Sequence, residues 1–368
     1  MISIRKTIKY LNLGRKKILH EIDINRFLKT GNRPPRPLKL YYLMTNKCNF
    51  ACRMCPQWKA GQKEDPNAYI SEDRMKEIID EMKNSGMAEI GFSGGEPLLY
   101  KDKLLNLLTY ANEKGLYTHF ATNGKLVTRE FLDAYNRVGG GHISLSVDAL
   151  GGKHDELRGF SGAYEAALEV INIIKRNDFG NLNLKINLTL SQGNLEEALR
   201  VARMATENNV LIFIQPYDSY DYGNKNIENK QQKDPLWIQK ESQDKLRQVI
   251  NELMEVKNKY PGLVLNSRGH LENFYPYFTD PQFSIECAAP LDSLSIDPFG
   301  NIIFCKFGII GNIKNNSLKA FLESDTRKRI VGAALSCREG CLLGCMFRPG
   351  VSEMLKGGAG HLAKLIRR

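Results

Sequence analysis

Three cysteines near the start of the chain have a spacing that suits an iron-sulfur cluster. Cys48, Cys52 and Cys55 lie in the segment TNKCNFACRMCPQW, directly after a predicted strand. Three thiolates hold three irons of a four-iron cluster, so the fourth iron keeps an open position for a chelating ligand. A zinc site, which prefers four closed ligands, and a set of reactive free thiols are the alternatives. The number of thiolates favours the cluster over both.

A glycine-rich turn follows the next predicted strand. Its sequence is Ser93-Gly94-Gly95-Glu96-Pro97. The two glycines let the backbone come close to a ligand, and the rigid Pro97 helps to aim Glu96. A Gly-Gly turn alone is only a tight connection, but its place downstream of the cysteine loop favours a role in binding.

Three weaker signals lie at or after the ends of later predicted strands. They are Thr122-Asn123-Gly124, Ser146 in Ser146-Val147-Asp148, and Arg158 in HDELRG. An Arg fork suits a carboxylate geometrically. For each signal, a helix cap or a surface salt bridge stays open as the alternative. His119, inside a predicted strand, is interpreted as a core residue.

A second group of five cysteines lies near the C-terminus: Cys287, Cys305, Cys337, Cys341 and Cys345. The segment DPFGNIIFC predicts a β-hairpin with its turn at Gly300, which brings Cys305 back towards Cys287. Five thiolates suffice for one four-iron cluster and cannot fully ligate two. A structural zinc ion in a small cysteine-rich appendage is a serious competitor at this site.

The elements that must position these residues are repeated βα units. Strands are predicted at 39–45, 88–92, 117–121, 142–147, 183–189 and 210–215. Between the first two strands a helix begins at Ser71, with apolar residues at helical spacing: Met75, Ile78, Ile79 and Met82. Each polar motif therefore follows a strand, at the carboxyl edge where parallel α/β folds place their active sites.

The predicted fold is α/β, a partial (βα)6 TIM-like barrel with a smaller cysteine-rich α+β domain. The chain is divided into a basic N-terminal segment (1–37), a core (38–218), a linker with an amphipathic helix at 236–258 (219–270), a cysteine-rich domain (271–350) and a basic tail (351–368). With 368 residues, two domains are the expectation.

Charge, hydropathy and cysteine content narrow the classes of function that this protein could have. Residues 1–37 account for +8 of the formal net charge of +11, so the rest of the chain is nearly balanced and a general nucleic-acid groove is not indicated. No apolar run approaches the roughly 20 residues of a membrane-spanning helix, and no secretory signal is evident, which predicts a cytoplasmic protein. Both cysteine groups hold an odd number, which fits metal binding better than disulfides.

The cysteine and glycine motifs together resemble the radical S-adenosylmethionine (SAM) superfamily, whose signature is CxxxCxxC at the end of the first strand. The resemblance covers most of residues 38–350 and implies a [4Fe-4S] cluster with SAM on its open iron. It implies that Gly94, Gly95 and Glu96 bind the SAM amino group, Ser146 the ribose and methionine part, and Arg158 the carboxylate. Met54 stands where the family usually has an aromatic residue near the adenine.

The C-terminal cysteines resemble the auxiliary-cluster domains called SPASM and twitch, although the full SPASM pattern has seven. This implies a second [4Fe-4S] cluster, with its ligands chosen as Cys287, Cys305, Cys345 and either Cys337 or Cys341. The implied activity is reductive cleavage of SAM to a 5′-deoxyadenosyl radical that abstracts a hydrogen atom from a substrate. A net oxidation or rearrangement would follow, with a low-potential electron donor such as flavodoxin or ferredoxin. A non-catalytic iron-sulfur or zinc scaffold is the contrasting hypothesis.

The predictions of a substrate class and of a membrane contact rest on weaker arguments. Thirty-seven residues precede the core, too few for a separate leader-binding domain, so small molecules, sugars or lipid-linked intermediates are favoured over peptides. The N-terminal segment is expected to be helical, broken at Gly14, with an apolar face that could touch an anionic membrane weakly. That face comprises Ile4, Ile8, Leu11, Ile18, Leu19 and Ile22. Packing of this helix on the barrel is the alternative.

Overall fold

A computed structural model describes residues 4–177, 179–218 and 234–343 of the chain. Most of the predicted linker, residues 219–233, lies outside the described residues, as do Cys345 and the basic tail from 351. Within the described ranges, no helix combines the length and apolarity that crossing a membrane requires.

The centre of the molecule is a sheet of nine strands in the order β6-β5-β4-β3-β2-β1-β7-β8-β9. The six strands that run parallel in sequence order are β1 (Lys39–Leu43), β2 (Glu89–Ser93), β3 (Tyr117–Thr122), β4 (Gly141–Ser146), β5 (Leu182–Leu190) and β6 (Leu211–Pro216). Because β6 and β9 are the two ends of the sheet, the barrel is open. The predicted partial (βα)6 barrel is confirmed.

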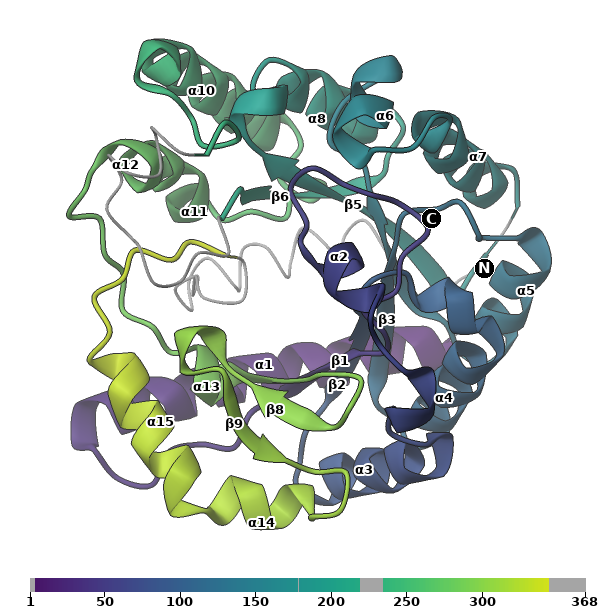
Figure 1. The fold of residues 1–368 in the computed structure, drawn as a ribbon, viewed down its shortest axis with the longest axis vertical. Helices are drawn as coiled ribbons and strands as arrows, with labels where there is room; N and C mark the ends of the chain where they lie inside the picture. Colours follow the sequence, from purple (N-terminus) through teal and green to yellow (C-terminus); the bar gives the residue numbers. More distant parts are fainter. Residues whose placement is uncertain (1–3, 178, 219–233, 344–368) are drawn as a thin grey trace.

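Helices cover the outer face of this curved sheet (Figure 1). In the core they are α3 (Glu72–Asn84), α4 (Lys101–Glu113), α5 (Arg129–Arg137), α6 (Gly152–Arg158), α7 (Ala163–Arg176) and α8 (Glu197–Glu207), while the short α2 (Gln57–Gly61) lies in front of the sheet in this view. After the core come α10 (Gln243–Lys259), α11 (Arg268–Glu272), α12 (Phe274–Thr279), α13 (Ala289–Asp292), α14 (Leu318–Glu323) and α15 (Asp325–Leu335).

The local chemistry of α3 explains where this helix begins and which face it buries. The Ser71 hydroxyl accepts a hydrogen bond from the Arg74 N–H and caps the first turn. The four predicted apolar residues, Met75, Ile78, Ile79 and Met82, are all buried. Their spacing of three or four residues places them on one face, so the helix packs on the sheet as predicted.

The predicted helix at 236–258 was too long at its N-terminal end. Helix α10 begins at Gln243, because the preceding apolar residues enter the core as an irregular segment. Trp237 is buried, and its ring N–H donates to the Phe278 carbonyl at 3.3 Å. A helical periodicity in Leu236–Ile238 therefore reflected core packing and not continuation of the helix.

The N-terminal helix α1 (Ile4–Thr30) is continuous, so the predicted break at Gly14 was wrong. Glycine lowers helix propensity by only about 1 kcal/mol. Packing offsets this cost: Leu13 contacts Leu38, Ala88 and Tyr117 at the amino ends of β1 to β3. Figure 1 shows α1, in purple, crossing the sheet at the level of β1 and β2.

The predicted apolar face of α1 is only partly buried against the chain. Leu11, Leu19 and Ile22 are exposed. By contrast, Ile24 on another side of the helix packs against Ala288. The helix thus packs on the core while leaving an apolar stripe outside, and contact with a membrane stays a prediction.

The C-terminal segment extends the same sheet. Strand β7 (Ser293–Ile296) pairs parallel with β1 on the side opposite β2, and β8 (Asn301–Ile303) and β9 (Ile309–Asn312) follow antiparallel. The predicted hairpin turn at Gly300 is confirmed, with φ at +80°, a conformation that glycine adopts readily. The boundary drawn at 271 stays a prediction.

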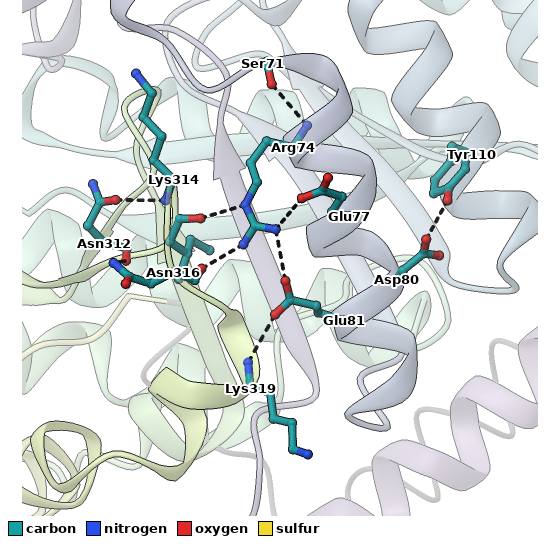
Figure 2. A network of polar contacts seen from close by, with 11 residues as sticks. Ser71, Arg74, Glu77, Asp80, Glu81, Tyr110, Asn312, Lys314, Asn316 and Lys319 are labelled. Atoms are coloured by element: carbon teal, nitrogen blue, oxygen red, sulfur yellow. Dashed lines mark hydrogen bonds and ion pairs between the residues drawn. The ribbon is translucent and has the colours of Figure 1, made fainter.

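One arginine of α3 ties this C-terminal segment to the core (Figure 2). The Arg74 guanidinium donates to the backbone carbonyls of Ile313 at 3.1 Å and Asn316 at 2.7 Å. The same group pairs with Glu77 and Glu81 of its own helix, and the Glu81 carboxylate accepts from the Lys319 N–H. Helix α3 therefore holds the loop between β9 and α14.

Candidate functional site

One cavity gathers the residues that follow four different strands. Its walls contain all eight residues predicted for the cluster and for SAM: Cys48, Cys52, Cys55, Gly94, Gly95, Glu96, Ser146 and Arg158. The remaining lining residues are Phe50, Trp58, Ser93, Ala121, Thr122 and Asn123. The parallel strands explain this convergence, because their carboxyl ends meet at one edge of the sheet.

The cysteine loop is fixed by bonds at both its ends. The Phe50 N–H points at the Cys48 sulfur at 3.4 Å, and the Cys55 N–H donates to the Cys52 carbonyl at 3.2 Å. Burial raises the pKa of Cys48 to about 11 and also raises that of Cys52. These thiols are therefore protonated without metal, and binding of a metal centre would release their protons.

The two glycines of the turn pack against the cysteine loop itself. A side chain on Gly94 would collide with the Thr45 carbonyl, and one on Gly95 with the Lys47 carbonyl. The Gly95 N–H donates to the Thr45 carbonyl at 2.6 Å, and the Glu96 N–H donates to the Lys47 carbonyl at 2.9 Å. We expected glycine at these positions so that the backbone could approach a ligand. The structure shows that glycine is needed here because the turn packs directly against the backbone of the cysteine loop.

Glu96 connects two strand ends and is completely buried. Its carboxylate accepts hydrogen bonds from the Thr122 hydroxyl at 2.9 Å, the Asn123 N–H at 2.9 Å and the Leu98 N–H at 3.1 Å. Burial raises its pKa to about 7, although these donors oppose the shift. The carboxylate thus holds the Thr122-Asn123 turn against the glycine turn while it lines the cavity.

Arg158 forms a buried ion pair at the edge of the cavity. One guanidinium nitrogen lies 2.6 Å from the carboxylate of Asp148, and another lies 3.9 Å from the sulfur of Cys52. Burial alone would lower the pKa of Arg158, but Asp148 and Cys52 raise it above its ordinary value. Arg158 thus forms a salt bridge with a buried partner, and its guanidinium also stands beside Cys52. Its role in binding SAM stays a prediction.

Comparison with known proteins agrees with this geometry. The family model of the radical SAM superfamily matches residues 42–207. The chain carries a radical SAM domain. The matched residues contain the end of β1, all of β2 to β5, and every residue that lines the cavity.

Curated relatives match less than half of this chain. An AdoMet-dependent heme synthase of Methanosarcina barkeri is 33% identical over 172 residues, which are 46% of this chain and 48% of the relative. A PqqA peptide cyclase of Rhodopseudomonas palustris is 31% identical over 160 residues, 43% of this chain and 41% of that protein. The match thus spans less than half the length of these relatives.

Solved structures share the fold over most of the chain. SuiB of Streptococcus suis bound to S-adenosylmethionine has a TM-score of 0.63 at 19% identity, covering 88% of this chain and 79% of SuiB. The anSMEcpe structure with bound AdoMet and a peptide has a TM-score of 0.61 at 16% identity, covering 90% and 98%. At this identity the likeness establishes the fold alone. It extends beyond the radical SAM domain into the C-terminal region.

Sequence reasoning missed two residues that shape the radical SAM site. Trp58 lines the cavity, and its ring N–H donates to the Cys52 carbonyl at 3.2 Å. Gly159 ends α6 with φ at +60°, and a side chain there would collide with the Ala51 carbonyl of the cysteine loop. Two features of the sequence could have pointed to these residues: an aromatic residue shortly after Cys55, and a glycine directly after Arg158.

The C-terminal cysteines are only partly brought together by the described residues. Cys287 and Cys305 pack against one apolar cluster that contains Phe304 and Ala334. Cys337 follows α15, and its N–H donates to the Ala334 carbonyl at 3.0 Å. Cys341 is buried, and Cys345 lies outside the described residues. The predicted approach of Cys305 to Cys287 agrees with this packing, while the complete ligand set stays a prediction.

The described side chains also bear on how the first cysteine group could hold a metal. Over the residues that the structure describes, no three His, Cys, Asp or Glu side chains converge as a group suited to one metal ion. The first three cysteines instead surround a shared cavity. This arrangement fits a multi-iron cluster whose ligands each bind a different iron.

Proposed function

We propose that this protein is a radical SAM enzyme whose cluster is held by Cys48, Cys52 and Cys55. The observation that carries the proposal is that these cysteines share one cavity with the glycine turn, Ser146 and Arg158. When bound, the reduced cluster and SAM supply one-electron cleavage of a carbon-sulfur bond, giving methionine and a 5′-deoxyadenosyl radical that takes a hydrogen atom from the substrate.

The residues around the cluster position the SAM molecule in this proposal. Gly94, Gly95 and Glu96 receive the amino group, Ser146 receives the ribose and methionine part, and Arg158 receives the carboxylate. Asp148 keeps the Arg158 guanidinium in place through the 2.6 Å ion pair. The cation beside Cys52 also offsets the negative charge of a thiolate-ligated cluster.

We further propose an auxiliary [4Fe-4S] cluster in the C-terminal segment. Its ligands would be Cys287, Cys305, Cys345 and one of Cys337 and Cys341. The apolar contacts that Cys287 and Cys305 share support this choice. The fold likeness to SuiB over 88% of the chain supports a domain of the SPASM and twitch kind.

The substrate class is open to two candidates. The preference for small molecules, sugars or lipid-linked intermediates finds no support in the comparisons, because the relatives include a PqqA peptide cyclase as well as an AdoMet-dependent heme synthase. Peptide modification is the second candidate function, favoured by the 31% identity with the peptide cyclase. In either case a low-potential donor such as flavodoxin or ferredoxin would supply the electron.

Anaerobic reconstitution with iron and sulfide tests the proposal. The reconstituted protein, given SAM and dithionite, should form 5′-deoxyadenosine and methionine in equal amounts. Addition of SAM should also change the electron paramagnetic resonance spectrum of the reduced cluster, because SAM binds its open iron. Protein that holds iron and sulfide but gives neither response would favour a non-catalytic scaffold.

A further inference from the structure

The inner face of the curved sheet is less buried than its outer face, which helices cover. Along β1, β5 and β6, fully buried residues alternate with half-buried ones. The buried set, which includes Leu40, Ile186 and Ile212, belongs to the main core. The half-buried set points the opposite way, since successive side chains of a strand alternate between faces. It consists of Lys39, Tyr41, Leu43, Lys185, Asn187, Thr189, Phe213 and Gln215.

Acidic groups near the amino ends of these strands already have cationic partners. Lys17 of α1 lies 2.9 Å from the Glu89 carboxylate, and Lys39 lies 2.7 Å from that of Asp292. Burial alone would raise the pKa of Glu89, but the nearby cations Lys17 and Lys39 lower it to about 2. Glu89 is therefore ionised, and each of the two acids is paired with one lysine.

His119 adds no positive charge to this group. Burial lowers its pKa to about 4, so the ring is neutral near pH 7. It lies 3.3 Å from Glu89 and stacks on His142 with a centroid distance of 4.3 Å. The inner face therefore gains no cation from His119.

Lys185 is the remaining cation of the inner face. Among the described residues, no carboxylate lies within ion-pair distance of its ammonium, which stands 6.0 Å from the ring centre of Phe213. Burial lowers the pKa of Lys185 to about 8; Glu89 opposes this shift, and the cations Lys17 and Lys39 add to it. A poorly hydrated cation without a direct ion pair costs stability, and a bound anion would offset that cost.

A second polar group lies between Lys185 and the cysteine cavity. Asn187 is opposite Ser146 in the sheet, and Ser146 lines the cavity; Lys185 is opposite Ser144, two residues further from that edge. Two residues of a strand span about 7 Å. The Asn187 side-chain oxygen is buried and accepts no hydrogen bond from the described residues. An unmet cation and an unmet acceptor thus stand on one face, beneath the proposed SAM site.

We propose that Lys185 and Asn187 anchor the substrate of this enzyme, with Lys185 binding a carboxylate and Asn187 accepting a hydrogen bond from a neighbouring donor. The inference rests on the proposed function, because it places the substrate below the SAM site. It specifies an anionic substrate group, which a peptide or a small acid could supply. The anchor is a binding element and takes no part in breaking bonds.

The test uses benzoate as a probe, because it joins a carboxylate to a ring that suits Phe213. Saturation-transfer NMR on the anaerobically reconstituted protein compares benzoate with its neutral analogue benzamide. We expect wild type to prefer benzoate by about tenfold, the value of one charge-assisted contact. Lys185→Met should lose this preference and Lys185→Arg should keep most of it. Lys240→Met, which changes an exposed lysine, is the matched control and should behave as wild type.

Folding and the proposed activity are measured separately. Removing an unmatched buried cation should leave the melting temperature of Lys185→Met equal to or above that of wild type, so a lost signal would not reflect unfolding. Equal binding of benzoate and benzamide by wild type would overturn the anchor, as would a benzoate preference that survives in Lys185→Met. Formation of 5′-deoxyadenosine by wild type is assayed in parallel. Its absence, with Lys185-dependent benzoate binding intact, would reject the radical SAM activity and leave the anion site.

Discussion

The two cysteine groups occupy different structural contexts. Cys48, Cys52 and Cys55 lie on one loop after β1, and all three line a single cavity. The other group is spread over an irregular segment before α13, a short 3-10 helix after β8, and the chain after α15. Cys305 itself has a φ of +43°, in the left-handed region that is costly for a residue other than glycine.

This difference indicates how each group depends on the rest of the molecule. The first needs only one strand end and the close packing of the glycine turn on its loop. The second needs β7 to pair with β1. It also needs Arg74 to hold the chain after β9 on α3. The first cysteine group is therefore a local motif that one edge of the sheet supports. The second group can come together only through contacts between residues that lie far apart in the chain.

Loss of one cysteine from the first group should have the largest effect. Cys48→Ala, Cys52→Ala or Cys55→Ala should each reduce formation of 5′-deoxyadenosine by at least about 100-fold, since three thiolates are needed to leave one iron open. Production is measured by liquid chromatography after reduction with dithionite, with Lys240→Met as the control. Substantial product from any of the three variants would sink the assignment of the cluster.

The iron content per chain should fall by about a factor of two when the first cysteine group is removed. We expect about eight irons per chain after anaerobic reconstitution, from two four-iron clusters, and about half in the variant that lacks Cys48, Cys52 and Cys55. Iron and zinc are measured by mass spectrometry of the purified protein. About four irons with stoichiometric zinc in wild type would instead favour structural zinc at the C-terminal group.

Arg74→Met should weaken the attachment of the C-terminal hairpin. The change removes hydrogen bonds to the carbonyls of Ile313 and Asn316, and we expect a loss of about 2 kcal/mol in the free energy of unfolding. Urea unfolding followed by circular dichroism measures this loss. Arg129→Met, which removes an exposed contact to Asp133, is the matched control and should change little. Equal stability of the two variants would show that Arg74 does not hold the hairpin.

The smallest effect is expected at α1, which contacts both regions. Its exposed Leu11, Leu19 and Ile22 should give weak association with anionic vesicles at low salt, aided by neighbouring basic side chains that contribute about 1 kcal/mol each. Replacing the three with serine should remove sedimentation with vesicles without changing iron content. If wild type and the variant sediment equally little, the lipid contact is rejected.

Much of the core could be predicted because its signals are local. All six predicted strands overlap β1 to β6, since each apolar run was bounded by a turn or a polar motif. The cysteine spacing defined the candidate cluster, and the Ser71 cap and the apolar residues behind it located α3. These features depend only on residues that are close together in the chain, so they can be recognised from the sequence alone.

Long-range contacts decided the rest. The pairing of β7 with β1, the buried Arg158–Asp148 pair and the unbroken α1 all depend on residues far apart in the chain or on packing against the sheet. Lys185 was unremarked in the sequence, where a lysine within a strand carries no special signal. Only the curved sheet places it on an inner face whose acids are already paired. The sequence determined which groups are present, and tertiary packing determined which of them lack a partner.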